Sequence, residues 1–340
     1  MRMAKQETDK ECLSILPSFR LLTLFLFTLY IIGPTEGVAL PSWYRFYVEK
    51  LSIALPLLFI LIGYSFGRDW DMPNSSLHYL RKNLILACKV ALSYILLSFV
   101  SWLLPQLTFL SSYFSSESSF WHQLIYPQRQ FFSFQSFVPT LVVLILLSIP
   151  LSKQTLPYFT RIVALGIACL ASLIANALLH EGSNSICLLG FDKGISYFFY
   201  FFWGAILYHT RNLLIEKKNR ILLLLLFHAV LFTRIFAPLS TDVLRFLNPL
   251  YNALLAAVYT LLASRMRPLT KKLFLQSLST YTIEAGTLVI VLAYLLRCLF
   301  FSTPTNPWLL GTIILFLFFF LLLFVSILIY FFECIFRKKS

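Results

Sequence analysis

Glu284 is the residue whose type and position best suit it to move a proton. It lies in an apolar stretch near the end of the chain, and no other acidic residue falls clearly within such a stretch. Removal from water favours the neutral form of a carboxyl group, so a buried Glu284 could exchange a proton near neutral pH. A basic neighbour such as Lys89 or Arg81 could instead pair with Glu284 and give it a structural role.

A group of cations lies on the connection between two apolar stretches. Arg68, Arg81 and Lys82 crowd this connection, and two aspartates lie near them. Such cations could hold the phosphates of an acyl-carrier nucleotide or of a lipid head group. Cations that only orient a protein in the membrane would look the same. Lys89 lies deeper in the next apolar stretch, where its long side chain could extend to the inner surface.

The cysteines and histidines do not show the spacing of a metal site. The six cysteines contain no CxxC pair, and the five histidines show neither HxxxH nor HExxH spacing. Four cysteines fall in or beside apolar stretches, which is typical of packing residues. We therefore expect no metal, no disulfide framework and no permanently bound cofactor.

Ten apolar stretches must position these residues. A helix needs about 20 residues to cross a hydrocarbon core of roughly 30 Å, and the stretches approach or reach that length. They predict an all-α, polytopic membrane protein. The predicted spans are 20–37, 51–66, 84–104, 137–151, 160–179, 194–209, 220–237, 248–264, 279–300 and 308–333.

The positive charges fall on alternate connections between these spans. With a cytoplasmic amino terminus, 20 of the 28 lysines and arginines lie inside, seven lie outside and Lys89 lies within a span. Short cytoplasmic loops carry an excess of lysine and arginine. The pattern therefore predicts ten crossings with both termini cytoplasmic. It divides the chain into a leader (1–19), a single ten-helix membrane domain (20–333) and a basic tail (334–340).

The composition limits the classes of partner. The chain is 59% hydrophobic and 12% charged, which leaves too little polar surface for a soluble protein of 340 residues. A net charge of +14 would suggest nucleic acid in a soluble protein. Here most of the excess lies in short loops beside an anionic leaflet, so we expect membrane lipids as partners and no nucleic acid. The sequence does not indicate an oligomeric state.

Two segments allow alternative interpretations. The first apolar run is short and is followed by small residues, as in a cleavable signal peptide. We favour a retained helix, because removal would leave nine spans and would start the charge alternation outside. The outward loop 105–136 is rich in serine and aromatic residues. Its aromatic residues could form an interfacial belt, or the loop could be a re-entrant lid or a sugar-stacking surface.

Several short segments, in the same order along the chain, are similar to motifs of one enzyme family. Leu55–Tyr64 is similar to a "PLFFFLSGYL" stretch, and a basic pair follows it. The remaining matches are Ser136–Pro139, which is similar to "WFLP"; Tyr197–Gly204, which is similar to "FFxxG"; and Ser277, Leu278 and Tyr281, which are similar to "SLxIYxxH". In this order they resemble the acyltransferase-3 family of integral-membrane O-acyltransferases, whose members have a ten-helix core.

Helix one and the last motif depart from the pattern of that family. Arg20 matches the arginine that the family places at the start of helix one. The family histidine near the end of that helix, its expected general base, is absent from Tyr30–Pro34, and Glu284 stands where the last motif has its histidine. The chain is then either a divergent enzyme that uses another base or a scaffold without the chemistry.

The resemblance implies transfer of an acyl group, expected to be acetyl, from acyl-coenzyme A to a hydroxyl of a glycan or glycolipid. It implies a protein of the bacterial inner membrane. Glu284 would act as the base, and Tyr281 would steer the carbonyl or hydroxyl. The cations expected to hold the donor phosphates are Arg20, Arg68, Arg81 and Lys82. A transporter or flippase for a lipid-linked saccharide is the main alternative, and a catalytically silent member of the same scaffold is another.

Overall fold

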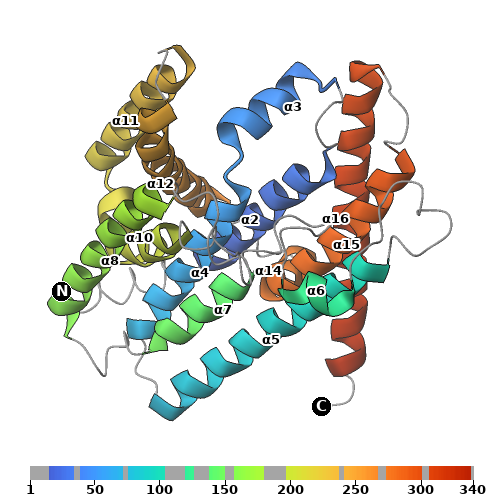
Figure 1. Ribbon diagram of the computed structural model, residues 1–340, viewed down its shortest axis with the longest axis horizontal. Coiled ribbons are helices and arrows are strands. Elements are labelled where there is room, and N and C mark those ends of the chain that lie inside the picture. The colour runs from blue at the N-terminus through green and yellow to red at the C-terminus, as the bar shows by residue number, and fades with distance from the viewer. Residues whose placement is uncertain are drawn as a thin grey trace. The chain divides into compact units, whose positions relative to one another are not determined.

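The structure is a computed structural model of the chain (Figure 1). It describes residues 15–33, 39–71, 76–103, 119–125, 138–149, 157–179, 197–236, 241–266, 273–300 and 306–337. Every regular element among these residues is a helix, which confirms the all-α fold class.

Each of the ten predicted spans overlaps a helix. These helices are α2 (Ile15–Ile32), α4 (Ala54–Asp71), α5 (Ser76–Leu103), α7 (Val138–Leu147), α8 (Tyr158–Leu179), α10 (Phe198–Ile215), α11 (Lys217–Phe236), α12 (Thr241–Arg265), α15 (Thr282–Phe300) and α16 (Pro307–Arg337). The shorter elements are α3 (Ser42–Phe46), the π-helix η1 (Tyr47–Leu51), α6 (Phe120–Ile125) and α14 (Leu273–Thr280). The prediction that helix one extends to residue 37 is wrong, because α2 ends at Ile32.

Four helices in the described part of the chain are long and apolar enough to cross a membrane. They are Ile15–Ile32, Leu77–Val100, Tyr158–Ala175 and Pro307–Phe332, and the bent pair Ser42–Leu51 and Ala54–Trp70 would make a fifth. The chain thus carries the apolar helices of a membrane protein. The helix α7 has only ten residues, too few for a crossing by itself. The ten-crossing topology stays a prediction.

The chain divides into two compact units. Unit 1 comprises residues 1–54 and 259–340, and unit 2 comprises residues 55–258. The single membrane domain expected for residues 20–333 stays a prediction.

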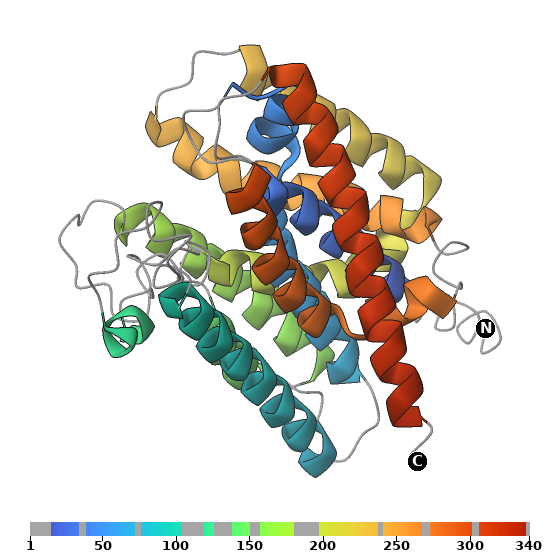
Figure 2. The same cartoon turned by 90° about the vertical axis from the view of Figure 1, so that its right-hand side faces the viewer.

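In unit 1, α2 packs against α14, α15 and α16. The last of these runs as one long helix, red in Figure 2. Its start follows from the local sequence, because the side-chain oxygen of Asn306 accepts a hydrogen bond from the backbone N–H of Trp308 at 3.0 Å. Pro307 occupies the first helical position, where its missing N–H is not needed. The rings of Phe25 and Phe318 join α2 to α16.

Two tyrosines hold the end of α2. The Tyr44 hydroxyl lies 3.0 Å from the carbonyl oxygen of Leu29 and 3.3 Å from that of Tyr30, and it can donate to either. The Tyr47 hydroxyl donates to the carbonyl oxygen of Leu26 at 2.6 Å. The last four carbonyls of a helix have no partner within it, so Tyr44 satisfies groups that the end of α2 leaves open.

In unit 2, α4 and α10 approach each other through glycines. A Cβ atom on Gly63 would lie 1.9 Å from the carbonyl oxygen of Phe201, and one on Gly204 would lie 2.1 Å from that of Ile60. Gly67 lies against Ala205 of the same α10 surface. Gly63 and Gly67 form a GxxxG pair, a spacing that lets two helix backbones approach closely. The same unit packs α8 against α10 and α5 against α7.

Large apolar side chains face outward on the long helices. In α16, Trp308 is 83% exposed and Phe319 is 67% exposed, and α5, α8 and α11 carry similar exposed apolar side chains. Lipid tails can cover such surfaces, whereas exposing them to water would cost free energy.

Most of loop 105–136 lies outside the described residues. Within it, the Phe120 ring of α6 packs against Phe99 and Trp102 of α5. Neither interpretation of the loop is tested.

Candidate functional site

The predicted site residues are divided between the two units. Arg20, Tyr281 and Glu284 belong to unit 1, whereas the Arg68, Arg81 and Lys82 cluster belongs to unit 2.

A helix break positions Tyr281 and Glu284. Tyr281 is the single residue between α14 and α15. Its carbonyl oxygen accepts the backbone N–H of Ala285 at 2.8 Å, and the Thr282 hydroxyl donates to the carbonyl oxygen of Ser279 at 2.8 Å. Serine and threonine compete with helical hydrogen bonds through such contacts. The predicted span 279–300 is therefore corrected, because it ran through Tyr281 without a break.

The break changes the surroundings of Glu284. This residue lies in the first turn of α15 and is half-buried, instead of lying within one continuous helix over 279–300. The N-terminal end of a helix carries a partial positive charge, and it stabilises a carboxylate in the first turn. The break therefore places the Glu284 carboxylate at the start of α15, three positions after Tyr281.

Arg20 lies on α2, which packs against both α14 and α15. The side chains of Arg20, Tyr281 and Glu284 are all half-buried. The structure thus brings together the helices that carry the predicted base, the predicted steering hydroxyl and one predicted cation.

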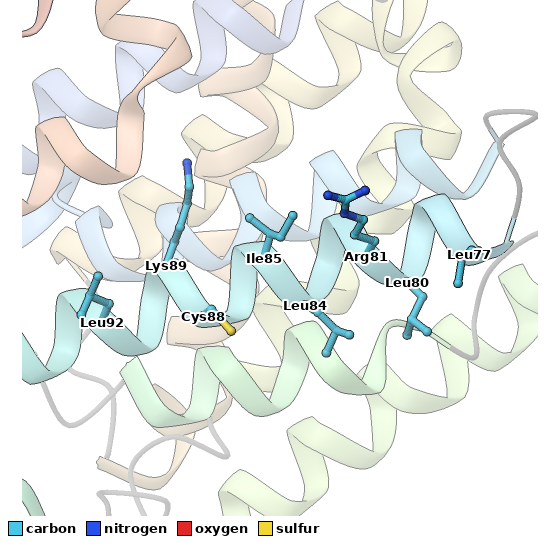
Figure 3. A pocket seen from close by; sticks show the side chains of 8 residues that line it. All are labelled: Leu77, Leu80, Arg81, Leu84, Ile85, Cys88, Lys89 and Leu92. Atoms are coloured by element: carbon cyan, nitrogen blue, oxygen red, sulfur yellow. The ribbon is translucent and has the colours of Figure 1, made fainter. Parts of the chain in front are cut away.

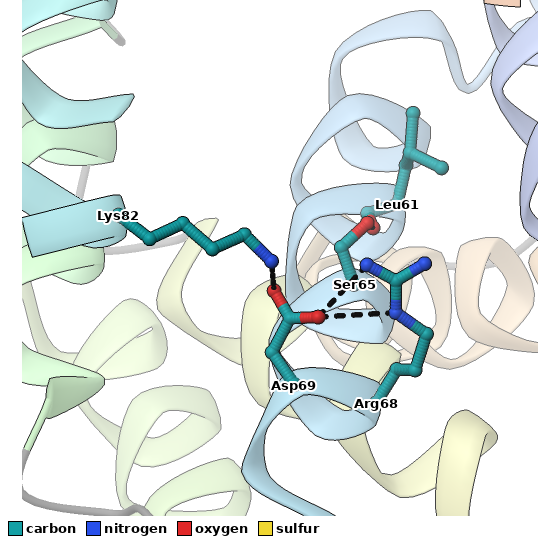
Figure 4. Close-up of polar contacts among 5 residues, drawn as sticks. All are labelled: Leu61, Ser65, Arg68, Asp69 and Lys82. Carbon is teal, nitrogen blue, oxygen red and sulfur yellow. Dashed lines mark hydrogen bonds and ion pairs between the residues drawn. The ribbon is translucent and has the colours of Figure 1, made fainter. Parts of the chain in front are cut away.

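In unit 2, Asp69 joins two of the predicted cations (Figure 4). One carboxylate oxygen of Asp69 accepts hydrogen bonds from Arg68 at 2.8 and 3.0 Å. The other carboxylate oxygen pairs with the Lys82 ammonium group at 2.5 Å. The carboxylate therefore links the end of α4 to the first turns of α5, and the three side chains together keep one net positive charge.

A buried polar layer lies beside this cluster, and sequence reasoning missed it. The Trp70 indole N–H donates to the carbonyl oxygen of Ser148 at 3.2 Å. Trp70, Tyr79, Asn83 and Ser148 are all more than nine-tenths buried. The sequence held one signal for this layer, which is the presence of polar side chains in otherwise apolar stretches. A buried polar side chain there needs a hydrogen-bond partner.

Arg81 does not share the arrangement of its neighbour Lys82. Asp69 pairs with Arg68 and Lys82 in the described part of the chain, and Arg81 is not in these ion pairs. Arg81 instead lines an apolar groove along α5 (Figure 3). Arg68 and Lys82 therefore meet at Asp69, whereas Arg81 lies on the groove.

Arg161 is a second residue that sequence reasoning missed. It lies in the first turn of α8 and is only 1% exposed. Tyr158 precedes Arg161 by about one helical turn. Its ring lies edge-on to the ring of His209 of α10, with ring centres 5.4 Å apart. A buried guanidinium group is a candidate anion contact.

The described residues contain no group of three or more histidine, cysteine, aspartate or glutamate side chains that could hold a metal ion.

No family model matches the sequence, and no curated protein or solved structure matches it significantly. The resemblance to acyltransferase-3 proteins therefore stays a prediction, supported by the motifs alone.

We expect the Asp69 contacts to contribute to stability. Asp69→Asn would leave the Arg68 and Lys82 charges without their carboxylate, whose side chain is only 10% exposed. The expected loss is about 1–2 kcal/mol, between the values for exposed and buried pairs. Thermal unfolding in detergent would measure it. Glu216→Gln, at an exposed carboxylate, is the control, and equal unfolding temperatures for the two variants would contradict the prediction.

Proposed function

We propose that the protein is a multi-pass membrane O-acyltransferase. It transfers an acyl group, expected to be acetyl, from acyl-coenzyme A to a hydroxyl group of a glycan or glycolipid. The observation that carries the proposal is the break between α14 and α15. It puts Tyr281 and Glu284 at the start of a helix that packs against α2, the helix that carries Arg20.

In the proposed reaction the acceptor hydroxyl attacks the carbonyl carbon of the thioester. Glu284 takes the hydroxyl proton as the new C–O bond forms. The Tyr281 hydroxyl donates a hydrogen bond to the oxygen that becomes negative. The C–S bond then breaks, and the leaving thiolate takes the proton back from Glu284 to give free coenzyme A.

Cations at the inner ends of the helices would hold the donor phosphates. In unit 1, which also carries Tyr281 and Glu284, Arg20 of α2 would supply such a positive charge. The proposal includes ten crossings with both termini in the cytoplasm of a bacterium, because this topology gives the donor access from inside. The acceptor would then be a lipid-linked or surface glycan.

Two measurements test the enzyme proposal together. Mass spectrometry would compare envelope glycolipids from cells with and without the gene, and purified protein would be tested for coenzyme A release from acetyl-coenzyme A. We expect the loss of one acylated species without the gene, and acceptor-dependent release of the thiol. An unchanged glycolipid pattern together with no thiol release would overturn the proposal.

The interrupted helices also support a transporter or flippase for a lipid-linked saccharide. Discontinuous helices form the binding sites of many transporters. Breaks occur at Tyr281 and between η1 and α4, where Tyr259 donates a hydrogen bond to the free carbonyl oxygen of Leu51 at 2.9 Å. Vesicles with the reconstituted protein and a labelled lipid-linked saccharide would distinguish the two functions. Movement of unmodified label would favour transport.

A further inference from the structure

A groove of about 560 Å³ runs along α5, apart from the Asp69 ion pairs (Figure 3). Five aliphatic side chains, one thiol and two cations line it. The lining residues are Leu77, Leu80, Arg81, Leu84, Ile85, Cys88, Lys89 and Leu92. All of them are exposed, and α5 from Leu77 to Val100 is one of the helices that could cross a membrane.

The lining falls into two rows with helical spacing. Residues four apart lie above one another on a helix. One row carries the charges and consists of Leu77, Arg81, Ile85 and Lys89, whereas the other is uncharged and consists of Leu80, Leu84, Cys88 and Leu92. Figure 3 shows Arg81 and Lys89 projecting to the same side of α5, with Ile85 between them.

We propose that this groove binds an anionic phospholipid. The uncharged row gives an acyl chain an apolar surface that runs along the helix. The two cations meet the phosphate at the head of the same molecule. Arg81 lies near the start of α5, and Lys89 lies eight residues, or roughly 12 Å, further along. The long, flexible Lys89 side chain can reach toward the head group that Arg81 contacts.

The chemistry of the lining favours this occupant over others. A zwitterionic lipid brings a cationic head group close to Arg81 and Lys89, which weakens its attraction to them. A soluble nucleotide has no acyl chain to cover the exposed leucines. The inference does not depend on acyl transfer, because it gives Arg81 a lipid ligand in place of the donor phosphate that the sequence motifs suggested.

Native mass spectrometry of the full-length protein tests the proposal. Delipidated protein would be offered phosphatidylglycerol and phosphatidylcholine with the same acyl chains. We expect wild-type protein to prefer phosphatidylglycerol. The double variant Arg81→Gln with Lys89→Gln should lose about 25-fold of that preference, at roughly fivefold for each cation. The matched control is Lys218→Gln with Arg265→Gln, which removes two exposed charges from outside the groove and should keep the preference.

A second variant keeps the test valid if the double variant does not fold. Leu84→Trp changes an exposed position and retains both cations. Its added fluorescence should be quenched more strongly by phosphatidylglycerol with brominated chains than by the matching phosphatidylcholine. Equal quenching by the two lipids would overturn the proposal. So would equal losses of preference in the groove and control variants, or displacement of the lipid by soluble glycerol phosphate.

Discussion

Gly204→Ala is expected to destabilise the protein by about 3 kcal/mol, although it adds only one methyl group. The added carbon would lie 2.1 Å from the carbonyl oxygen of Ile60. That oxygen belongs to the backbone of α4 and cannot rotate away as a side chain could. The two helices must separate by about 1 Å to restore ordinary contact, and a close-packed interior transmits such a shift to its neighbours. Gly63→Ala should have a similar effect, because its added carbon would meet the carbonyl oxygen of Phe201.

Gly166→Ala in α8 is the matched control for these variants. An added carbon there meets no atom of the described residues within 4 Å. Alanine is a better helix former than glycine, so this variant should gain about 0.5–1 kcal/mol. Thermal unfolding of the three variants in the same detergent would measure the differences. If Gly204→Ala unfolded at the same temperature as Gly166→Ala, the close contact of α4 and α10 would be wrong.

Glu284→Gln is expected to reduce acyl transfer by about 10²–10⁴-fold, which is the usual contribution of a general base. Glutamine has nearly the same shape but cannot take the proton of the acceptor hydroxyl. Loss of the charge in the first turn of α15 should cost only about 0.3–1 kcal/mol of stability. The variant should therefore fold, and its defect should appear in the rate of coenzyme A release.

Glu49→Gln provides the control for this loss of activity. Glu49 is an exposed carboxylate of the same unit, and its replacement should leave turnover unchanged. If Glu284→Gln released coenzyme A as fast as Glu49→Gln, another residue would have to be the base. If Glu284→Gln left every cellular phenotype intact, the catalytically silent scaffold would be the better interpretation.

The end of helix one bears on the choice of base. A Cβ atom on Gly33 would lie 1.7 Å from the Tyr44 hydroxyl oxygen. No side chain can be added at this position unless Tyr44 moves and gives up its hydrogen bonds to the end of α2. A larger residue at position 33 would therefore displace the Tyr44 ring from the end of α2. The proposed base is Glu284, because Tyr30–Pro34 contains no histidine.

Helix positions were more predictable than helix ends. All ten apolar stretches overlap helices, but α10 extends to Ile215, past the predicted end at 209. Helix ends depend on hydrogen bonds made by a few polar side chains, and hydropathy does not detect them. The break at Tyr281 is the clearest example, because serine and threonine contacts interrupt a stretch that is apolar enough for one helix.

The sequence by itself determined that this chain forms apolar helices of membrane-spanning character. In lipid, a helix satisfies its backbone hydrogen bonds within one segment, so long apolar runs are sufficient to predict it. Only the tertiary structure decided which side chains meet. The partners Asp69 and Lys82 are thirteen positions apart, and Gly63 meets Phe201 from a distant helix. Such contacts depend on which helices pack together, and the residue pattern of one helix does not specify its partner helix.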